Sequence, residues 1–206
     1  MSWWWRARAL TAVAVTLVAS IAVSIAVHGA ALPMPNIVGG VLVPVVFAYL
    51  LPLAPIVTVW YGVDRSRGHL DRIGVRDTSL LDLAVLAVAL AVTAVVVAAT
   101  WSTDLWPLGI GFLRNLIGCA GLALLVAPFI GTRLATVVPV SAVIISALLG
   151  TGLGGRAQWW AWPTAEARSW AHFAEAVAVL LAGVVVARWH RSHVPRRIGW
   201  WLPVRS

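Results

Sequence analysis

The chain has 206 residues, of which 61% are hydrophobic and 11% are charged, and its formal net charge is +8 at pH 7. A soluble domain averages about 25% charged residues and has too little interior to cover so much apolar surface, so the composition excludes a soluble globular protein and indicates an integral membrane protein. All of the basic residues are arginine and lie mainly at the ends of apolar runs, which favours a role in membrane orientation over nucleic-acid binding.

Six apolar segments are each close to the roughly 20 residues that a helix needs to cross the hydrocarbon core of a bilayer. The sequence therefore predicts an all-α, polytopic membrane protein with six transmembrane helices in a single domain, residues 1–206. The predicted spans are about 9–27, 37–61, 80–100, 108–129, 134–152 and 171–188.

The first predicted elements are an interfacial helix and two spans. "MSWWWRAR" combines tryptophan with arginine, which is typical of a short N-terminal helix lying in the membrane interface. The apolar run that follows is longer than the core of a signal peptide, so we interpret it as a retained span. Pro44, Pro52 and Pro55 lie in the second segment, which predicts a kinked helix.

A charged segment, "DRSRGHLDRIGVRD" at residues 64–77, follows the second span and holds seven of the 22 charged residues. Asp64 or Ser66 could cap a short helix here, and Gly74 could end it. Arg67 and Asp71 are spaced to pair at i, i+4, and Leu70 and Ile73 would share one face. We therefore predict a two-turn cytoplasmic helix that packs against a partner; the alternative is that its apolar face dips into the lipid interface.

The third and fourth spans have recognisable starts. Ser79 and Asp82 form a capping box before the third, and Pro107 occupies a favoured first-turn position before the fourth. The chain's single cysteine, Cys119, lies in the fourth span. This excludes an intrachain disulfide and a cysteine metal site, and predicts a small buried apolar side chain.

Two charged residues lie inside predicted spans, where charge is costly and usually serves a purpose. Arg114 lies roughly 10 Å along its helix from Pro107, at 1.5 Å per residue, and Glu175 lies a few residues inside the last span. Because both approach from the outer side, we predict an intramembrane charge pair. It could be a structural ion pair, a gate or a substrate contact; alternatively, Arg114 could snorkel outward.

The long segment before the last span, residues 153–172, contains four tryptophans and a run of good helix formers after Pro163. We predict an outer interfacial or re-entrant helix here, with a flexible outer loop as the alternative. "RRIGWW", near the end of the chain, again predicts a segment in the cytoplasmic interface.

Arginine and tryptophan together predict the orientation. With both termini cytoplasmic, twelve of the fifteen arginines fall on the cytoplasmic side, which leaves Arg114, Arg156 and Arg168 outside. The thirteen tryptophans lie near the predicted span ends, as an aromatic belt requires. The predicted location is thus the plasma membrane, with both termini in the cytoplasm.

Several motifs are missing from the sequence. A chain without lysine has no phosphate-binding P-loop and no ATPase site of that type. His190 and His193 have arginine and tryptophan as neighbours and no nearby carboxylate, which favours a basic helix end over a metal site. No nucleophile, base and orienting acid of a hydrolase can be recognised together. We therefore predict no cofactor and no catalytic or metal-binding residues.

Two stretches resemble a known family. "YLLPLAPIVTVWYGVDRSRGHLDRIGVRDTSLLDL" and "GFLRNLIGCAGLALLVAPFIGTRLATVVPV" resemble small, high-GC bacterial membrane proteins related to type-2 ABC exporter permeases. The shared features are the apolar Leu-Pro run, the charged loop, Arg-Asn-Leu followed by Gly-x-x-Gly, and the final proline. The similarity covers about residues 45–140.

This resemblance implies a six-span fold with an amphipathic first helix, a cytoplasmic coupling helix between spans two and three, and short outer helices before the last span. It also implies two permease chains, as a homodimer or heterodimer, driven by two soluble ATPase subunits. The residues expected to couple to the ATPase are Arg67, Leu70, Asp71, Arg72, Ile73 and Arg76.

The function expected from the sequence is that of a permease subunit of an ABC exporter, surrounded by membrane lipids and carrying an amphipathic substrate such as a peptide, antibiotic or lipid. One alternative is a membrane accessory subunit without a transport path, for example in an immunity or assembly complex. Another is an integral membrane enzyme acting on lipids. Copurification of an ATPase would distinguish the permease hypothesis from the two alternatives.

Overall fold

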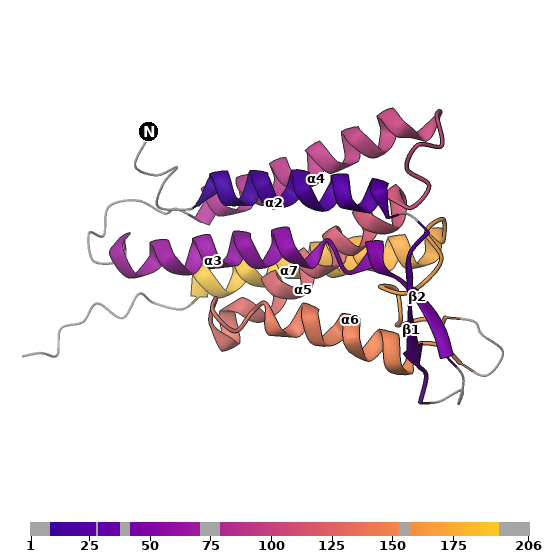
Figure 1. Ribbon diagram of the computed structural model, residues 1–206. Helices are drawn as coiled ribbons and strands as arrows, with labels where there is room; N and C mark the ends of the chain where they lie inside the picture. The colour runs from indigo at the N-terminus through magenta and orange to yellow at the C-terminus, as the bar shows by residue number, and fades with distance from the viewer. Residues whose placement is uncertain (1–8, 28, 38–41, 71–78, 153–156, 194–206) are drawn as a thin grey trace, which may run out of the picture.

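The computed structural model describes residues 9–27, 29–37, 42–70, 79–152 and 157–193. Within these residues the chain is mostly helical, with one two-stranded antiparallel sheet (Figure 1). The elements are α2 (Leu10–Ala26), β1 (Ala31–Pro35), β2 (Leu42–Val46), the 3-10 helix η1 (Phe47–Tyr49), α3 (Leu53–Leu70), α4 (Ser79–Trp101), α5 (Gly109–Ile130), α6 (Val137–Leu149) and α7 (Trp170–His193).

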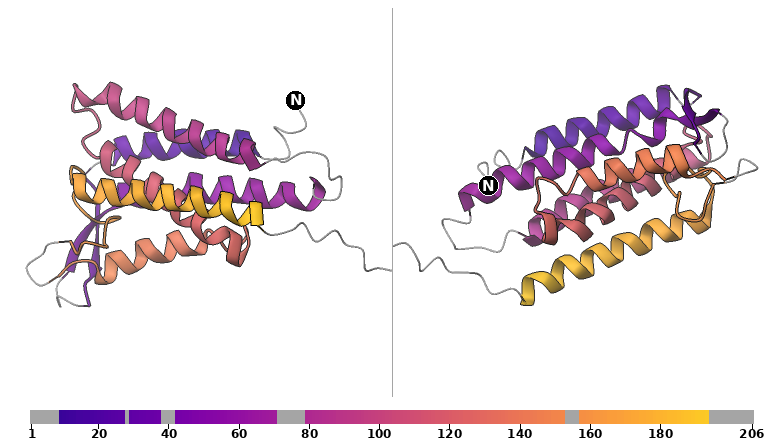
Figure 2. Two further views of the ribbon diagram at one scale, coloured as in Figure 1. Left: turned by 180° about the vertical axis from the view of Figure 1, so that it is seen from behind. Right: turned by 90° about the horizontal axis from the view of Figure 1, so that it is seen from below.

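Consecutive helices run in opposite directions along one bundle (Figures 1 and 2). The β1–β2 hairpin, the α4–α5 connection and the segment before α7 lie at one end, which we call the hairpin end. α2 begins at the opposite end, where α3 and α7 end and α5 connects to α6. We call this the arginine end, because it holds five of the seven described arginines: Arg65, Arg67, Arg133, Arg188 and Arg191.

Four helical segments of the described chain are long and apolar enough to cross a membrane: Phe47–Arg65, Asp82–Trp101, Gly109–Ile130 and Trp170–His190. The first and fifth predicted spans correspond to α2 and α6, which are apolar but shorter, at 17 and 13 residues. The described chain is therefore a helical protein with four candidate membrane spans and two shorter apolar helices.

The predicted second span, 37–61, is wrong in its first part, and with it the prediction of a fold without strands. Residues Leu42–Val46 form β2 rather than helix, and α3 begins only at Leu53. Pro52 and Pro55 flank this start, where a helix needs no backbone N–H from its first residues. Pro44 therefore lies in a strand and the other two prolines lie at the start of a helix, and none of the three kinks one long helix.

Prolines also explain why a hairpin forms before α3. Pro33 lies directly opposite Pro44 in the register of β1 and β2. The Phe47 N–H donates to the Ala30 carbonyl at 3.0 Å, so by the alternation of an antiparallel ladder the proline pair is one that exchanges no hydrogen bonds. Proline's missing N–H therefore costs this two-stranded sheet nothing, whereas it would break a helix interior.

α3 runs without interruption through the charged segment as far as Leu70. The predicted separate helix capped by Asp64 or Ser66 is therefore wrong, because both residues lie inside α3. Extending an existing helix adds a hydrogen bond with each residue, whereas a new helix needs its own costly nucleus. The rest of the predicted coupling helix, residues 71–78, lies outside the described residues, as do the two predicted interfacial segments at the chain ends.

α5 is the central helix of the bundle, and most of its residues are buried. Its closest neighbour is α7, and glycine permits that approach. A Cβ atom added to Gly121 would lie 2.5 Å from the Leu180 backbone nitrogen, and one added to Gly183 would overlap the Gly121 carbonyl oxygen. The two backbones therefore touch at this crossing, as small residues allow in membrane helix pairs.

The described tryptophans differ in exposure, and Trp160 is intermediate. Trp101, Trp159, Trp170 and Trp189 are exposed, whereas Trp60, Trp106 and Trp162 are buried. Trp60 lies in the middle of α3, and the Trp106 indole donates to Ser24 Oγ at 2.9 Å across the bundle. The buried tryptophans pack in the core, and the aromatic belt stays a prediction.

The segment before α7 is a buried loop and not the predicted outer helix. Residues 157–169 form turns, and α7 begins at Trp170. Ala161, Trp162 and Ala165 are nevertheless almost fully buried, so this segment folds back into the hairpin end of the bundle. Its backbone takes hydrogen bonds from the side chains of α5, and this removes the need for helical bonding of its own.

Candidate polar site in the bundle core

The most unusual side chains of the described chain are Arg114 and Asn115 on α5, because both are 0% exposed. They lie two turns from the hairpin end of an otherwise apolar helix. A buried charge is tolerated only when hydrogen bonds replace its hydration. We define the polar cluster as Arg114, Asn115, Tyr49, Glu175 and the loop residues 163–166, whose backbone lies against them.

Arg114 is held by oxygen atoms of the loop before α7. Its Nη1 and Nη2 groups donate to the backbone carbonyls of Glu166 at 2.6 Å and of Ala165 at 2.8 Å, while Nε donates to Asn115 Oδ1 at 3.3 Å. The fork geometry of guanidinium suits such paired acceptors. The arginine therefore does not snorkel to the surface but binds a loop that is distant in sequence.

Asn115 extends the same bonding to a third segment. Its Nδ2 group donates to the carbonyl of Pro163 at 2.8 Å and to that of Tyr49 at 3.1 Å. Those two carbonyls belong to the loop before α7 and to η1. One amide thus joins α5, η1 and the loop, and adjacent residues Arg114 and Asn115 together satisfy four backbone carbonyls.

Tyr49 closes the cluster on the side of α3. Its ring lies under the Arg114 guanidinium, with 5.6 Å between the guanidinium carbon and the ring centroid, which adds a cation–π contact. A Cβ atom on Gly111 would lie 2.6 Å from this ring. The glycine one turn before Arg114 therefore makes the space that the tyrosine occupies.

Glu175 lies on α7 near the same cluster. Its carboxylate interacts electrostatically with Arg114, but the direct contacts described for Arg114 go to the loop carbonyls, to Asn115 and to the Tyr49 ring. The Glu175 Oε2 atom is buried and has no hydrogen-bond partner among the described residues. The two predicted residues thus belong to one cluster, and their pairing as a direct salt bridge stays a prediction.

Sequence reasoning missed Asn115, Tyr49 and the loop carbonyls as members of this cluster. Asn115 carried a usable signal, since an amide next to a buried arginine in an apolar helix needs partners of its own. The loop carbonyls carried no such signal, because every residue has a backbone carbonyl and the fold alone determines which of them accept bonds from Arg114 and Asn115.

The predicted coupling residues fall at the arginine end. Arg67 and Leu70 lie in the last turns of α3, whereas Asp71, Arg72, Ile73 and Arg76 lie outside the described residues. Within the same charged segment, Asp64 Oδ1 accepts a hydrogen bond from Thr132 Oγ1 at 3.0 Å. This contact ties α3 to the connection between α5 and α6.

A serine and a histidine do meet at the start of α7. Ser169 Oγ lies 2.7 Å from His172 Nδ1, and the other ring nitrogen lies 3.3 Å from the Gln158 carbonyl oxygen. Ser169 directly precedes the helix, and His172 is its third residue, which is the spacing of a capping interaction. No carboxylate contact of His172 is described, and the pair is a side-chain contact across the first turn of α7. Among the described residues, no three His, Cys, Asp or Glu side chains gather as a metal site requires.

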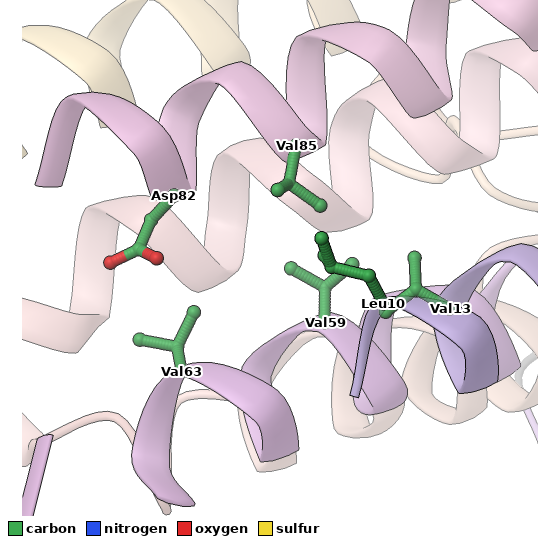
Figure 3. Close-up of a pocket in the computed structure, with 6 residues that line it drawn as sticks. All are labelled: Leu10, Val13, Val59, Val63, Asp82 and Val85. Atoms are coloured by element: carbon green, nitrogen blue, oxygen red, sulfur yellow. The ribbon is translucent and has the colours of Figure 1, made fainter. Parts of the chain in front are cut away.

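A small cavity of about 10 Å³ lies between α2, α3 and α4 (Figure 3). That volume is roughly enough for one water molecule and not for an organic substrate. Asp82, in the first turn of α4, is the acidic residue at its wall. The lining residues are Leu10, Val13, Val59, Val63, Asp82 and Val85.

Comparisons of this chain with protein-family models, with curated proteins and with solved structures found no match. Functional inference therefore depends on the chain's own residues and their arrangement.

Proposed function

We propose that this protein is the permease subunit of an ABC exporter, in which a separate soluble ATPase docks at the arginine end. The observation that carries the proposal is the end of α3, which extends beyond the other helices there (Figure 1). The candidate span ends at Arg65, but the helix continues to Leu70. A charged helical extension outside the apolar bundle is suited to a soluble partner and not to lipid tails.

The internal contacts of the bundle support a coupling role for this extension. Asp64, at its base, is bonded to Thr132 beside the end of α5, so a force applied to α3 would reach the central helix. Docking would involve Arg67, Leu70, Asp71, Arg72, Ile73 and Arg76. A second permease chain, identical or different, would complete the transport path for an amphipathic substrate.

The proposed orientation places the arginine end in the cytoplasm of a cell whose plasma membrane holds the protein. In a Cys119→Ser background, a single cysteine at Gln158 should react with a membrane-impermeant thiol reagent added outside intact cells. A cysteine at His69 should react only after the cells are opened. Gln158 lies at the hairpin end and His69 near the end of α3, so the reverse pattern would contradict the orientation.

The docking proposal predicts a specific loss of ATPase binding. Asp71→Arg and Arg72→Glu should each lower copurification of the ATPase at least about tenfold, because like charges at an interface cost several kcal/mol. Leu70→Asp should have a larger effect by placing a charge on the packed face. The measurement is the amount of ATPase protein and the ATP hydrolysis rate in the purified complex; the chain alone should hydrolyse no ATP.

Arg188→Glu is a matched control for these variants, because Arg188 lies at the same end of the bundle but on α7. It should leave ATPase binding near the wild-type level. If the three variants of the charged segment retain the ATPase as Arg188→Glu does, this segment is not the docking site. If the wild-type chain copurifies with no ATPase, the accessory-subunit alternative replaces the permease proposal.

A further inference from the structure

The loop that Arg114 holds has little bonding of its own. We call residues 161–166 the strap. Within and next to it, the Thr164 N–H donates to the Ala161 carbonyl and the Ala161 N–H to the Gln158 carbonyl, which are bonds of isolated turns. The strap is instead fixed from outside: Arg114 and Asn115 bind three of its carbonyls, and Thr164 Oγ1 donates to the Ser146 carbonyl of α6 at 3.4 Å.

Packing adds one more attachment to α5. The Trp162 ring lies against Gly118, where a Cβ atom would overlap it, and Trp162 is 7% exposed. The strap is therefore buried by contacts with α5 and, through Ala161 beside Gly150, with the end of α6, while its own backbone forms no regular ladder. A segment with few backbone hydrogen bonds of its own can open as a unit separate from the helices around it.

Glu175 offers Arg114 a second acceptor. Its Oε2 atom is buried without a hydrogen-bond partner among the described residues, and its charge already acts on Arg114. A carboxylate binds a guanidinium more strongly than backbone carbonyls do, because both partners are charged. Its two oxygens can also accept two parallel hydrogen bonds from the guanidinium. The free energy that the Arg114 guanidinium loses when it leaves the strap carbonyls can thus be offset by a bond to Glu175.

We infer that Arg114 is a two-position latch. In the closed state its guanidinium binds the Ala165 and Glu166 carbonyls and keeps the strap in the bundle. In the open state it binds the Glu175 carboxylate, and the strap leaves the hairpin end. Arg114 keeps strong acceptors in both positions, so opening never leaves the buried cation unbonded. This inference goes beyond the proposed function, because it holds whether or not an ATPase drives the opening.

The test is amide hydrogen exchange of the strap in the purified full-length chain in nanodiscs, for wild type, Arg114→Gln and Glu175→Gln. Arg114→Gln should speed exchange at 161–166 at least about tenfold, because it removes charge-assisted bonds that hold the closed state. Glu175→Gln should slow exchange several-fold, because it removes the acceptor that stabilises the open state. The two variants must change the exchange rate in opposite directions.

A purely structural role of Glu175 gives the contrary result. If its charge only helps to hold Arg114 on the strap, Glu175→Gln will speed exchange, and an unchanged rate would mean that it has no part in opening; either outcome overturns the latch. Should Arg114→Gln fail to fold, Glu175→Gln decides alone. Asp104→Asn is the matched control, because it makes the same change of carboxylate to amide outside the strap on a side chain that is 80% exposed, and it should leave the rate near that of wild type.

Discussion

Replacing Arg114 with methionine should lower the free energy of unfolding by about 3 kcal/mol or more, from the loss of two charge-assisted hydrogen bonds of about 1.5–3 kcal/mol each. Methionine fills much of the same volume but donates nothing, so the carbonyls of Ala165 and Glu166 lose the donors described for them. Glu175 loses the positive charge near it at the same time. Reversible unfolding in mixed micelles measures the effect.

Arg168→Met is the matched control, because the same substitution then falls on an exposed arginine. Arg168 pairs with Asp104 at 3.5 Å, and its side chain is 64% exposed. Exposed ion pairs are worth about 0–1 kcal/mol, so the stability should change little. If the two variants lost equal free energy of unfolding, the contribution of Arg114 to stability would not depend on its burial or on its bonds to the loop carbonyls.

Replacing Gly121 with valine should separate α5 from α7 or prevent folding. The new Cβ atom would lie 2.5 Å from the backbone nitrogen of Leu180 and 2.6 Å from its Cα atom. A backbone atom cannot rotate away as a side chain can, so the cost belongs at the upper end of the 1–3 kcal/mol typical of overpacking, or about 3 kcal/mol and more. Folded yield and thermal unfolding in detergent measure it.

Ala182→Val serves as the comparison, since Ala182 lies beside Gly183 on α7 but on the exposed side of the helix. The added methyl groups meet no protein there, and the unfolding temperature should stay close to that of the wild type. A Gly121→Val protein as stable as Ala182→Val would contradict the close crossing of the two helix backbones.

The helices that are continuous apolar runs could be predicted from the sequence within a few residues. The predictions 80–100 and 108–129 compare with Ser79–Trp101 and Gly109–Ile130. In such runs a helix satisfies every backbone group by itself, so hydropathy alone is a sufficient guide. The predicted last helix, 171–188, agrees at its start with α7, which continues to His193 because residues 189–193 contain no glycine or proline to end it.

Prediction was weaker where several structures satisfy the same composition. The proline-rich start of the second predicted span is apolar enough for a helix, yet proline suits the outer edges of a hairpin better. The segment before α7 contains good helix formers, yet it forms turns because Arg114 and Asn115 supply donors to its carbonyls. Both outcomes depend on contacts between segments that are far apart in the sequence.

The candidate site was half accessible from the sequence. Arg114 and Glu175 are conspicuous because charge is rare within apolar segments. The surroundings of Arg114 are not conspicuous, because two of its hydrogen-bond acceptors are backbone carbonyls about fifty positions later in the chain. A pattern of side chains can identify a buried charge, but the backbone groups that solvate it become known only from the fold.

The shortness of α6 has a consequence for the lipid around the protein. Its 13 residues give a helix about 20 Å long at 1.5 Å per residue, against a hydrocarbon layer about 30 Å thick. Ile144 and Ile145 are about half exposed on this helix, so acyl chains would reach it in the proposed six-span arrangement. A bilayer adapts to a short apolar surface by becoming locally thinner, at a cost of fractions of a kcal/mol per Å. Shorter acyl chains would need less deformation, so in the proposed arrangement the membrane beside α6 would favour them over longer ones.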